Sequence, residues 1–232
     1  MHLAWNSPLA WVRTRRLADA AGRRARAGIM RDTDQDLATV ILVRDDSDVA
    51  TVADLAGRTV ATGAVDSPQA TLLPLAHLAG LGLDPGTDVV VRRYDVGVGK
   101  HGDHVGGERD AVRALVAGDV DAACCLDANQ LLFAKEGTAP AGSTRVLTST
   151  PQYDHCCFTV LDDAPADLVD RFETLMLAMS FADPEVRPLL ELEGLTEWRP
   201  GRTEGYGQLE AAVDRLGFYG PDGTIMAADY RW

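Results

Sequence analysis

The chain has 232 residues, of which 46% are hydrophobic and 25% charged, as is typical of a soluble globular protein with one large domain or two smaller lobes. Its formal net charge of −13 argues against a nucleic-acid-binding surface. A membrane-spanning helix requires about 20 consecutive apolar residues, and no apolar run in the sequence approaches that length. The N-terminus lacks the pattern of a secretory signal. As written, the sequence therefore predicts a cytoplasmic protein, or a periplasmic or cell-surface protein if the natural start lies upstream.

The first half of the chain alternates short β-prone runs with helices. Ser7 and Pro8 are predicted to cap and begin a helix, and the uniformly apolar run at residues 37–43 predicts a buried strand. The predicted elements are, in order, a strand at 3–5, a helix at 8–21, a strand at 37–43, a helical turn at 51–55, a strand at 59–62, a helix from 68 to about 80 and a strand at 89–94.

The second half continues this alternation after a glycine-dense stretch at residues 95–107, which we expect to be a loop. One helix is amphipathic, with Leu168, Phe172, Leu175 and Met179 on one face. The predicted elements are a helix at 108–117, a strand at 120–126, a helix at 129–135, strands at 145–148 and 157–161, and helices at 166–179, 184–192 and 208–216. Alternating strands and helices predict α/β units on a mostly parallel sheet.

The four cysteines form two adjacent pairs, Cys124 with Cys125 and Cys156 with Cys157. Adjacent cysteines seldom bridge each other, so reduced thiols are expected. Each pair lies in a β-prone run, where one member is expected to face the core and the other to face away from it.

The turn after the strand at 59–62 is a candidate binding site. Ser67 stands where a helix N-cap belongs, and Pro68 takes the first helical position. The first N–H groups of a helix lack intrahelical partners and the helix dipole favours negative charge, so such a turn can bind an anion. Ser67, Gln69 and Thr71 would add side-chain donors. The alternative interpretation is an ordinary capped strand–helix unit.

Several motifs, taken together, resemble the phosphate/phosphonate-type solute-binding proteins of ABC transporters. They are D-L-A-G-R-T-V-A-T-G at 54–63, S-P-Q-A-T at 67–71, L-x-x-L-G-L-D-P-G-T-D-V at 78–89 and A-V-R-A-L-V-A-G-D-V-D-A-A at 111–123. The resemblance implies an α/β, two-lobed type 2 periplasmic binding-protein fold, with mostly parallel sheets flanked by helices and two crossing strands at 37–43 and 157–161. Lobe 1 would then comprise residues 1–44 and 161–232, and lobe 2 residues 45–160.

The function implied by this resemblance is binding of a small anionic solute, such as phosphate or phosphonate, in the cleft between the lobes. An ABC permease would be the partner, and no cofactor would be needed. The implied ligand-binding residues are Asn6, Ser7, Ser67, Gln69, Thr71, Glu108, Asp127, Asn129 and Tyr153. The family's usual T-S-G after the capping serine is replaced here by Pro68, Gln69, Ala70 and Thr71, which leaves ligand specificity open.

The family begins with a strand, a helix and a second strand that have no counterpart before residues 3–5 here. Without them a sheet edge and an apolar helix face would be exposed. We therefore expect either a natural start upstream of Met1 or a partner that fills the gap.

Clusters of titratable residues keep an enzyme on the same fold as the alternative function, a lyase or a metal-dependent enzyme. His101, Asp103 and His104 lie within four residues and could bind a transition metal. The candidate catalytic residues are His101, His104, Asp154 and His155. A simpler interpretation makes the cysteines core residues and the histidines anion donors, and we favour the binding protein. A non-catalytic regulator is a third possibility.

Overall fold

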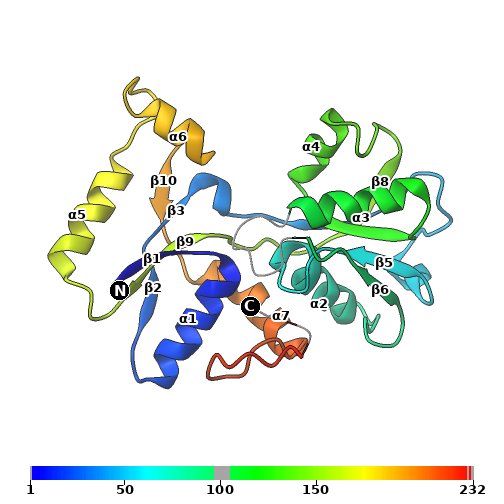
Figure 1. The fold of residues 1–232 in the computed structure, drawn as a ribbon, viewed down its shortest axis with the longest axis horizontal. Coiled ribbons are helices and arrows are strands. Elements are labelled where there is room, and N and C mark those ends of the chain that lie inside the picture. The colour runs from blue at the N-terminus through cyan, green and yellow to red at the C-terminus, as the bar shows by residue number, and fades with distance from the viewer. Residues whose placement is uncertain (1, 97–104, 229, 231–232) are drawn as a thin grey trace. The chain divides into compact units, whose positions relative to one another are not determined.

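The computed structural model describes residues 2–96, 105–228 and 230. The chain divides into two compact units (Figure 1). Unit 1 comprises Met1–Leu37, Tyr153–Glu210 and Phe218–Met226, and unit 2 comprises Ala38–Gln152, Ala211–Gly217 and Ala227–Trp232. The lobe boundaries expected near residues 44 and 160 lie further along the chain than these divisions, because strand β4 pairs within unit 2 and strand β9 within unit 1.

Unit 2 is built on a five-stranded sheet of order β6-β5-β7-β4-β8. The strands are β4 (Thr39–Arg44), β5 (Thr59–Thr62), β6 (Val90–Arg93), β7 (Ala122–Leu126) and β8 (Thr144–Ser149). Strand β5 is parallel to both β6 and β7, whereas β4 is antiparallel to β7 and β8. The predicted mostly parallel sheet is therefore confirmed for unit 2, since β5, β6, β7 and β8 run in one direction and β4, inserted between β7 and β8, runs in the opposite one.

Helices cover both faces of this sheet (Figure 1). Helix α2 (Leu73–Gly80) lies on one face, and helices α3 (Val105–Ala117) and α4 (Asn129–Lys135) lie on the other. Alternate residues of each strand enter different cores, so Cys124 packs with the α2 side and Cys125 with the α3 side. Both cysteines are buried, contrary to the expectation that one would face away, because this sheet has no solvated face.

Unit 1 contains a three-stranded antiparallel sheet of order β1-β9-β2 and a two-stranded sheet of β3 and β10. The strands are β1 (Leu3–Asn6), β2 (Ala25–Ala27), β3 (Ile29–Arg31), β9 (Cys157–Leu161) and β10 (Trp198–Pro200), and the helices are α1 (Pro8–Ala20), α5 (Ala166–Leu177) and α6 (Arg187–Glu193). Helix α7 (Gly207–Arg215) begins in unit 1, and its residues from Ala211 onward belong to unit 2. The sequence did not predict β2, β3 or β10. Each has three residues, too few for a periodic pattern, and forms only through pairing with distant segments.

Most predicted elements are confirmed, and several have the predicted bounds. Ser7 caps α1 by accepting a hydrogen bond from the backbone N–H of Ala10 (3.3 Å). Helix α3 begins at Val105, so the end of the predicted loop is helical. Its early glycine has a packing role, because a Cβ on Gly107 would lie 2.6 Å from the Tyr94 carbonyl oxygen.

Among the described residues, no helix is both long enough and apolar enough to cross a lipid bilayer.

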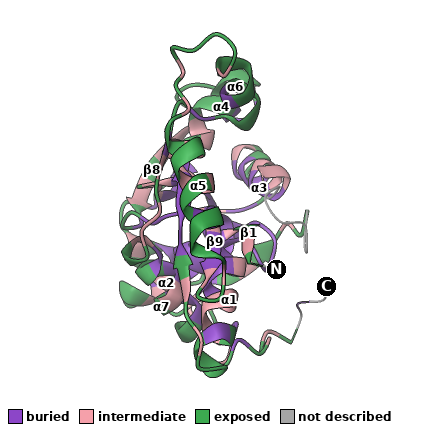
Figure 2. Cartoon of the chain, turned by 90° about the vertical axis from the view of Figure 1, so that its left-hand side faces the viewer, coloured by how far each residue is buried: buried purple, intermediate pink, exposed green. Residues whose placement is uncertain are grey.

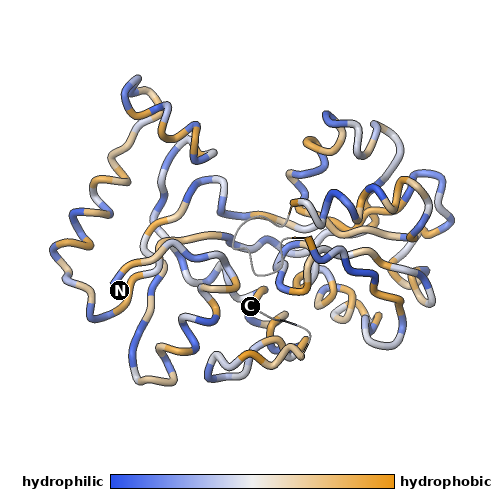
Figure 3. Tube along the Cα trace, in the orientation of Figure 1, coloured by the Kyte–Doolittle hydropathy of each residue, from blue (hydrophilic) through white to orange (hydrophobic). Residues whose placement is uncertain are grey.

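The predicted apolar face of α5 is only partly buried. Phe172 packs against Phe158 with ring centroids 5.0 Å apart, and Met179 joins the same core. Leu168 and Leu175, however, are 56% and 63% exposed. Figure 2 shows α5 as largely exposed, and Figure 3 shows hydrophobic residues along it. The helix thus contacts its core along one edge of its apolar face.

An ion pair between Asp154 and Arg202 ties together three segments of unit 1. The Asp154 carboxylate is fully buried and accepts two hydrogen bonds from the Arg202 guanidinium, each 2.6 Å long. It also accepts from the backbone N–H of Asp36, a residue with φ of 59°. A Cβ on Gly205 would overlap this carboxylate, so glycine is required there. Asp154 is therefore committed to a structural contact.

Replacing Arg202 with alanine should destabilise the protein by about 2–4 kcal/mol, because the buried Asp154 charge would lose its cation. Urea denaturation followed by circular dichroism measures this loss. Arg199→Ala is the matched control, since Arg199 pairs with the exposed Glu197 and should cost at most about 1 kcal/mol. Equal losses in the two variants would contradict the structural role of the buried pair.

Candidate functional site

The turn after β5 begins with Ser67, as the sequence predicts. The Ser67 hydroxyl accepts a hydrogen bond from the backbone N–H of Ala70 (3.2 Å), which confirms it as the N-cap. As an acceptor in this bond, the hydroxyl keeps its own proton for another partner. Ser67 is fully buried.

The first turn, Pro68–Leu72, is a π-helix that continues into α2. The N–H of Leu72 donates to the Ser67 carbonyl, five residues earlier (3.0 Å). Pro74 has no N–H to offer the Ala70 carbonyl, and that carbonyl accepts instead from the backbone N–H of Gly63 (3.2 Å). The bond closes the loop between β5 and the helix. Such π-turns are found frequently at functional sites.

Glu108 is itself a predicted ligand-binding residue, and it connects two others. One carboxylate oxygen accepts from the Gln69 side-chain amide (3.2 Å), and the other accepts from the Asn129 amide and the backbone N–H of Leu126, both at 2.8 Å. Glu108 is fully buried and lies in the first turn of α3, where the helix dipole favours a negative charge. The structure thus brings Gln69, Glu108 and Asn129 together. Their side chains form hydrogen bonds with one another, and this use differs from the predicted contact with a ligand.

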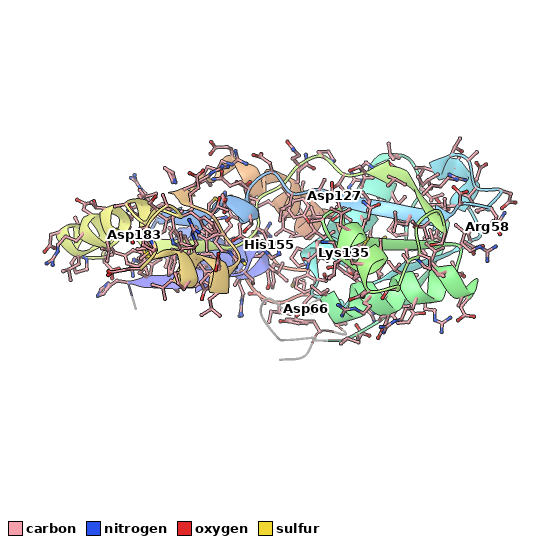
Figure 4. The ribbon with its side chains drawn as sticks, turned by 90° about the horizontal axis from the view of Figure 1, so that it is seen from above. Arg58, Asp66, Asp127, Lys135, His155 and Asp183 are labelled. Carbon is pink, nitrogen blue, oxygen red and sulfur yellow. The ribbon has the colours of Figure 1, made fainter. Side chains whose placement is uncertain are left out.

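Thr71 is also used within unit 2, because its hydroxyl donates to the Ala64 carbonyl (2.8 Å). Thr39 donates similarly to the Gln69 carbonyl (2.6 Å) and so fixes the helix start against β4. The side chain of Asp127 is exposed in the turn between β7 and α4 (Figure 4). Ser67 thus keeps a hydroxyl proton that it can donate to a ligand, and Asp127 presents an exposed carboxylate, which only accepts hydrogen bonds.

The other predicted ligand-binding residues, Asn6, Ser7 and Tyr153, belong to unit 1. Asn6 donates to the Thr159 hydroxyl across the β1–β9 pair (2.8 Å), Ser7 caps α1, and Tyr153 is buried. Their convergence with the unit 2 residues on one ligand stays a prediction. The candidate metal-binding and catalytic residues His101, Asp103 and His104 lie outside the described residues.

His155 belongs to a second polar cluster, in unit 1 (Figure 4). Its Nδ1 atom lies 3.3 Å from a carboxylate oxygen of Asp34 and 3.2 Å from the sulfur of Cys156. Burial opposes a charge on the imidazole, but the electrostatic interaction with Cys156 and the hydrogen bond to Asp34 outweigh it and raise the pKa of His155 to about 10. Burial likewise opposes ionisation of Asp34, yet hydrogen bonds from His155 and Arg31 hold the pKa of that carboxyl below its usual value.

Sequence reasoning singled out His155 but missed Asp34. The Asp34 side chain reaches the cluster from a short helical turn, Asp32–Asp34, more than a hundred residues earlier in the chain. Asp154, grouped with His155 in the sequence, points instead to Arg202. No sequence signal distinguishes these two aspartates, because the division depends on which segments fold together.

The family of this chain follows from residues 1–206, which match the family described as ABC transporter, phosphonate, periplasmic substrate-binding protein. The chain belongs to this family. The resemblance found in the sequence is thereby confirmed. No match was found among curated proteins.

Solved structures show that this binding protein has the two-lobed fold of its family. PhnD1 from Prochlorococcus marinus (MIT 9301), solved with methylphosphonate, is 14% identical, with a TM-score of 0.67 over 94% of this chain and 79% of that one. XAC2383 from Xanthomonas citri, solved with ATP, is 18% identical, with a TM-score of 0.68 over 94% and 79%. SsuA, the aliphatic sulphonate binding protein of Escherichia coli, is 22% identical, with a TM-score of 0.60 over 97% and 80%.

Membership of a substrate-binding family bears on whether the protein binds a solute or catalyses a reaction, and on its location. The family binds small solutes for ABC transporters, and the comparisons lend no support to the alternative of an enzyme. The family is periplasmic, so the expected cytoplasmic location also lacks support.

Glu108 offers a test of the internal cluster in this binding protein. Glu108→Gln places an amide N–H₂ against donors that now meet a carboxylate, so we expect a loss of about 1–3 kcal/mol in unfolding free energy. Urea denaturation measures it. Asp110→Asn, on the same helix, removes only a partly exposed pair with Arg113 and should change stability by at most about 0.5 kcal/mol. A Glu108→Gln variant as stable as the Asp110→Asn control would show that the cluster does not hold the site.

Proposed function

We propose that this protein binds a phosphonate-type oxyanion at the turn that begins with Ser67 and presents it to an ABC permease. The observation that carries the proposal is the capped helix start after β5, in a chain that belongs to a phosphonate-binding family. The ligands of similar proteins point to the same chemical class, since PhnD1 was solved with methylphosphonate and SsuA binds aliphatic sulphonates.

Two donors at this turn suit an oxyanion. The Ser67 hydroxyl accepts from Ala70 and can donate its proton to a ligand oxygen. Pro68 has no N–H, so the backbone N–H of Gln69 is the first that the helix start can direct outward. The positive end of the helix dipole adds to both, which favours an anionic ligand.

The negative charge of Glu108 does not oppose this binding strongly. Three donors, from Gln69, Leu126 and Asn129, surround the Glu108 carboxylate and satisfy it within unit 2. The same contacts immobilise the Gln69 side chain and so fix the helix start. A preorganised turn loses little conformational entropy when a ligand binds.

The location and partner of the protein follow from this role. A receptor for an importer works on the outer side of the membrane that holds its permease, so we infer a periplasmic or cell-surface location. Binding of a solute breaks no covalent bond, so the proposed function requires neither catalytic residues nor a cofactor. Asn6, Ser7, Asp127 and Tyr153 remain the candidates for further contacts to the ligand.

Isothermal titration calorimetry with methylphosphonate, phosphate and sulfate tests the proposal. We expect methylphosphonate to bind, and Ser67→Ala to weaken binding by about 1–3 kcal/mol, the value of a hydrogen bond to a charged group. Loss of the cap should also lower stability by about 1 kcal/mol, which a thermal melt records separately.

Ser47→Ala is the control for this experiment. Ser47 accepts from the backbone N–H of Val49 (3.2 Å) but follows β4 at the opposite edge of the same sheet. It should leave affinity unchanged. An unchanged affinity in Ser67→Ala would remove Ser67 from the site, and failure of all three anions to bind the natural protein would contradict the oxyanion assignment.

A further inference from the structure

Asp34, His155 and Cys156 bring three different metal-ligating atoms to one point in unit 1. A carboxylate oxygen, an imidazole nitrogen and a thiol sulfur all lie within 4.8 Å of one another. Asp34 and Cys156 are 2% and 4% exposed, and the His155 side chain is 16% exposed. The proposed oxyanion site uses none of the three.

The separations between these atoms suit a tetrahedral ion. Zinc bonds of about 2.0–2.3 Å at tetrahedral angles place neighbouring ligand atoms about 3.3–3.8 Å apart. The Asp34 oxygen and the Cys156 sulfur lie 3.3 and 3.2 Å from His155 Nδ1. Two of the three separations are therefore close to those between tetrahedral ligands, and the third, between the Asp34 oxygen and the Cys156 sulfur, is at most 4.8 Å.

Hydrogen bonding alone serves this cluster poorly. His155 Nδ1 faces both the Asp34 carboxylate and the Cys156 sulfur, yet a ring nitrogen carries at most one proton. An N–H that donates to Asp34 leaves no lone pair for the Cys156 S–H, so this ring nitrogen can serve only one of the two contacts well. A cation in place of the proton would contact all three ligand atoms at once.

Backbone contacts hold the cluster in place before any ion binds. The N–H of His155 donates to the Asp34 carbonyl (2.8 Å), and the N–H of Cys156 donates to the Asp34 carboxylate (3.3 Å). The Arg31 guanidinium pairs with the same carboxylate and orients it. Because Arg31 is itself a cation, it should repel a bound metal ion and weaken its binding relative to the same site without the arginine.

We propose that Asp34, His155 and Cys156 form a binding site for a divalent transition-metal ion of the Zn²⁺ or Co²⁺ class. Mixed oxygen, nitrogen and sulfur ligands select such ions over Mg²⁺ and Ca²⁺, which prefer oxygen alone. Three protein ligands leave a fourth position for water or another small ligand, as in open zinc sites.

Titration of the reduced, metal-free protein with Co²⁺ tests this site. We expect one ion per chain, a sulfur-to-cobalt charge-transfer band in the near ultraviolet, and displacement of the ion by Zn²⁺. Cys156→Ser should abolish the band, and Asp34→Asn and His155→Gln should each weaken binding by at least about tenfold.

Cys157→Ser is the matched control, because the neighbouring Cys157 sulfur points to the Thr159 hydroxyl (3.7 Å) and should leave the band unchanged. A second control, His101→Ala with His104→Ala, separates this site from the histidine-rich stretch near residue 100. Absence of the band, its persistence in Cys156→Ser, or its loss in the His101/His104 variant would each overturn the proposal.

Alkylation of the natural protein provides a measurement that requires no variant. Bound Zn²⁺ should slow iodoacetamide labelling of Cys156, read by peptide mass spectrometry, while labelling of Cys157 stays the same. Equal labelling of Cys156 with and without Zn²⁺ would contradict metal ligation even if the substituted proteins failed to fold.

Discussion

The arrangement of unit 2 depends on one buried carboxylate. Glu108 accepts hydrogen bonds from the helix start after β5, from the end of β7 and from the first residue of α4. These three segments leave the sheet at the same edge, and a single acceptor holds them there. A buried charge is tolerated only where donors surround it. Loss of the carboxylate would leave its donors without an acceptor, and loss of the donors would leave a buried charge unsatisfied.

Unit 1 uses buried carboxylates in two different ways. Asp154 is matched by a bidentate arginine and holds Asp36 in a left-handed backbone conformation. Asp34 is also paired with an arginine, but it has further contacts with the His155 imidazole and the backbone N–H of Cys156, and the Cys156 thiol lies within 4.8 Å of it. The first arrangement commits the carboxylate to an arginine, whereas the second places three metal-ligating atoms within 4.8 Å of one another. The difference separates a structural ion pair from a candidate site.

The two proposed sites are chemically complementary and independent. The Ser67 turn offers hydrogen-bond donors and a positive helix end, which suit an anion. The Asp34, His155 and Cys156 cluster offers lone pairs and negative charge, which suit a cation. Each lies within a different compact unit and can be altered without touching the residues of the other. Binding of one ligand can therefore be measured in a protein that lacks the other site.

The sequence by itself determined the elements with strong local signals and the family. The cap at Ser67 depends on a serine followed by proline, and the strand at 157–161 and the helix at 129–135 depend on apolar runs between turn residues, all of which are local chemistry. The long shared motifs determined the family and its two-lobed fold.

Only the tertiary structure decided how these pieces are used. Pairing between distant segments created β2, β3 and β10, and helices on both sheet faces buried both Cys124 and Cys125. The partners of Gln69, Glu108 and Asp34 also come from segments far away in the chain. A residue type states which bonds a side chain can form, but the fold selects the partner, because hydrogen bonds and ion pairs act over a few ångströms in space irrespective of separation in sequence.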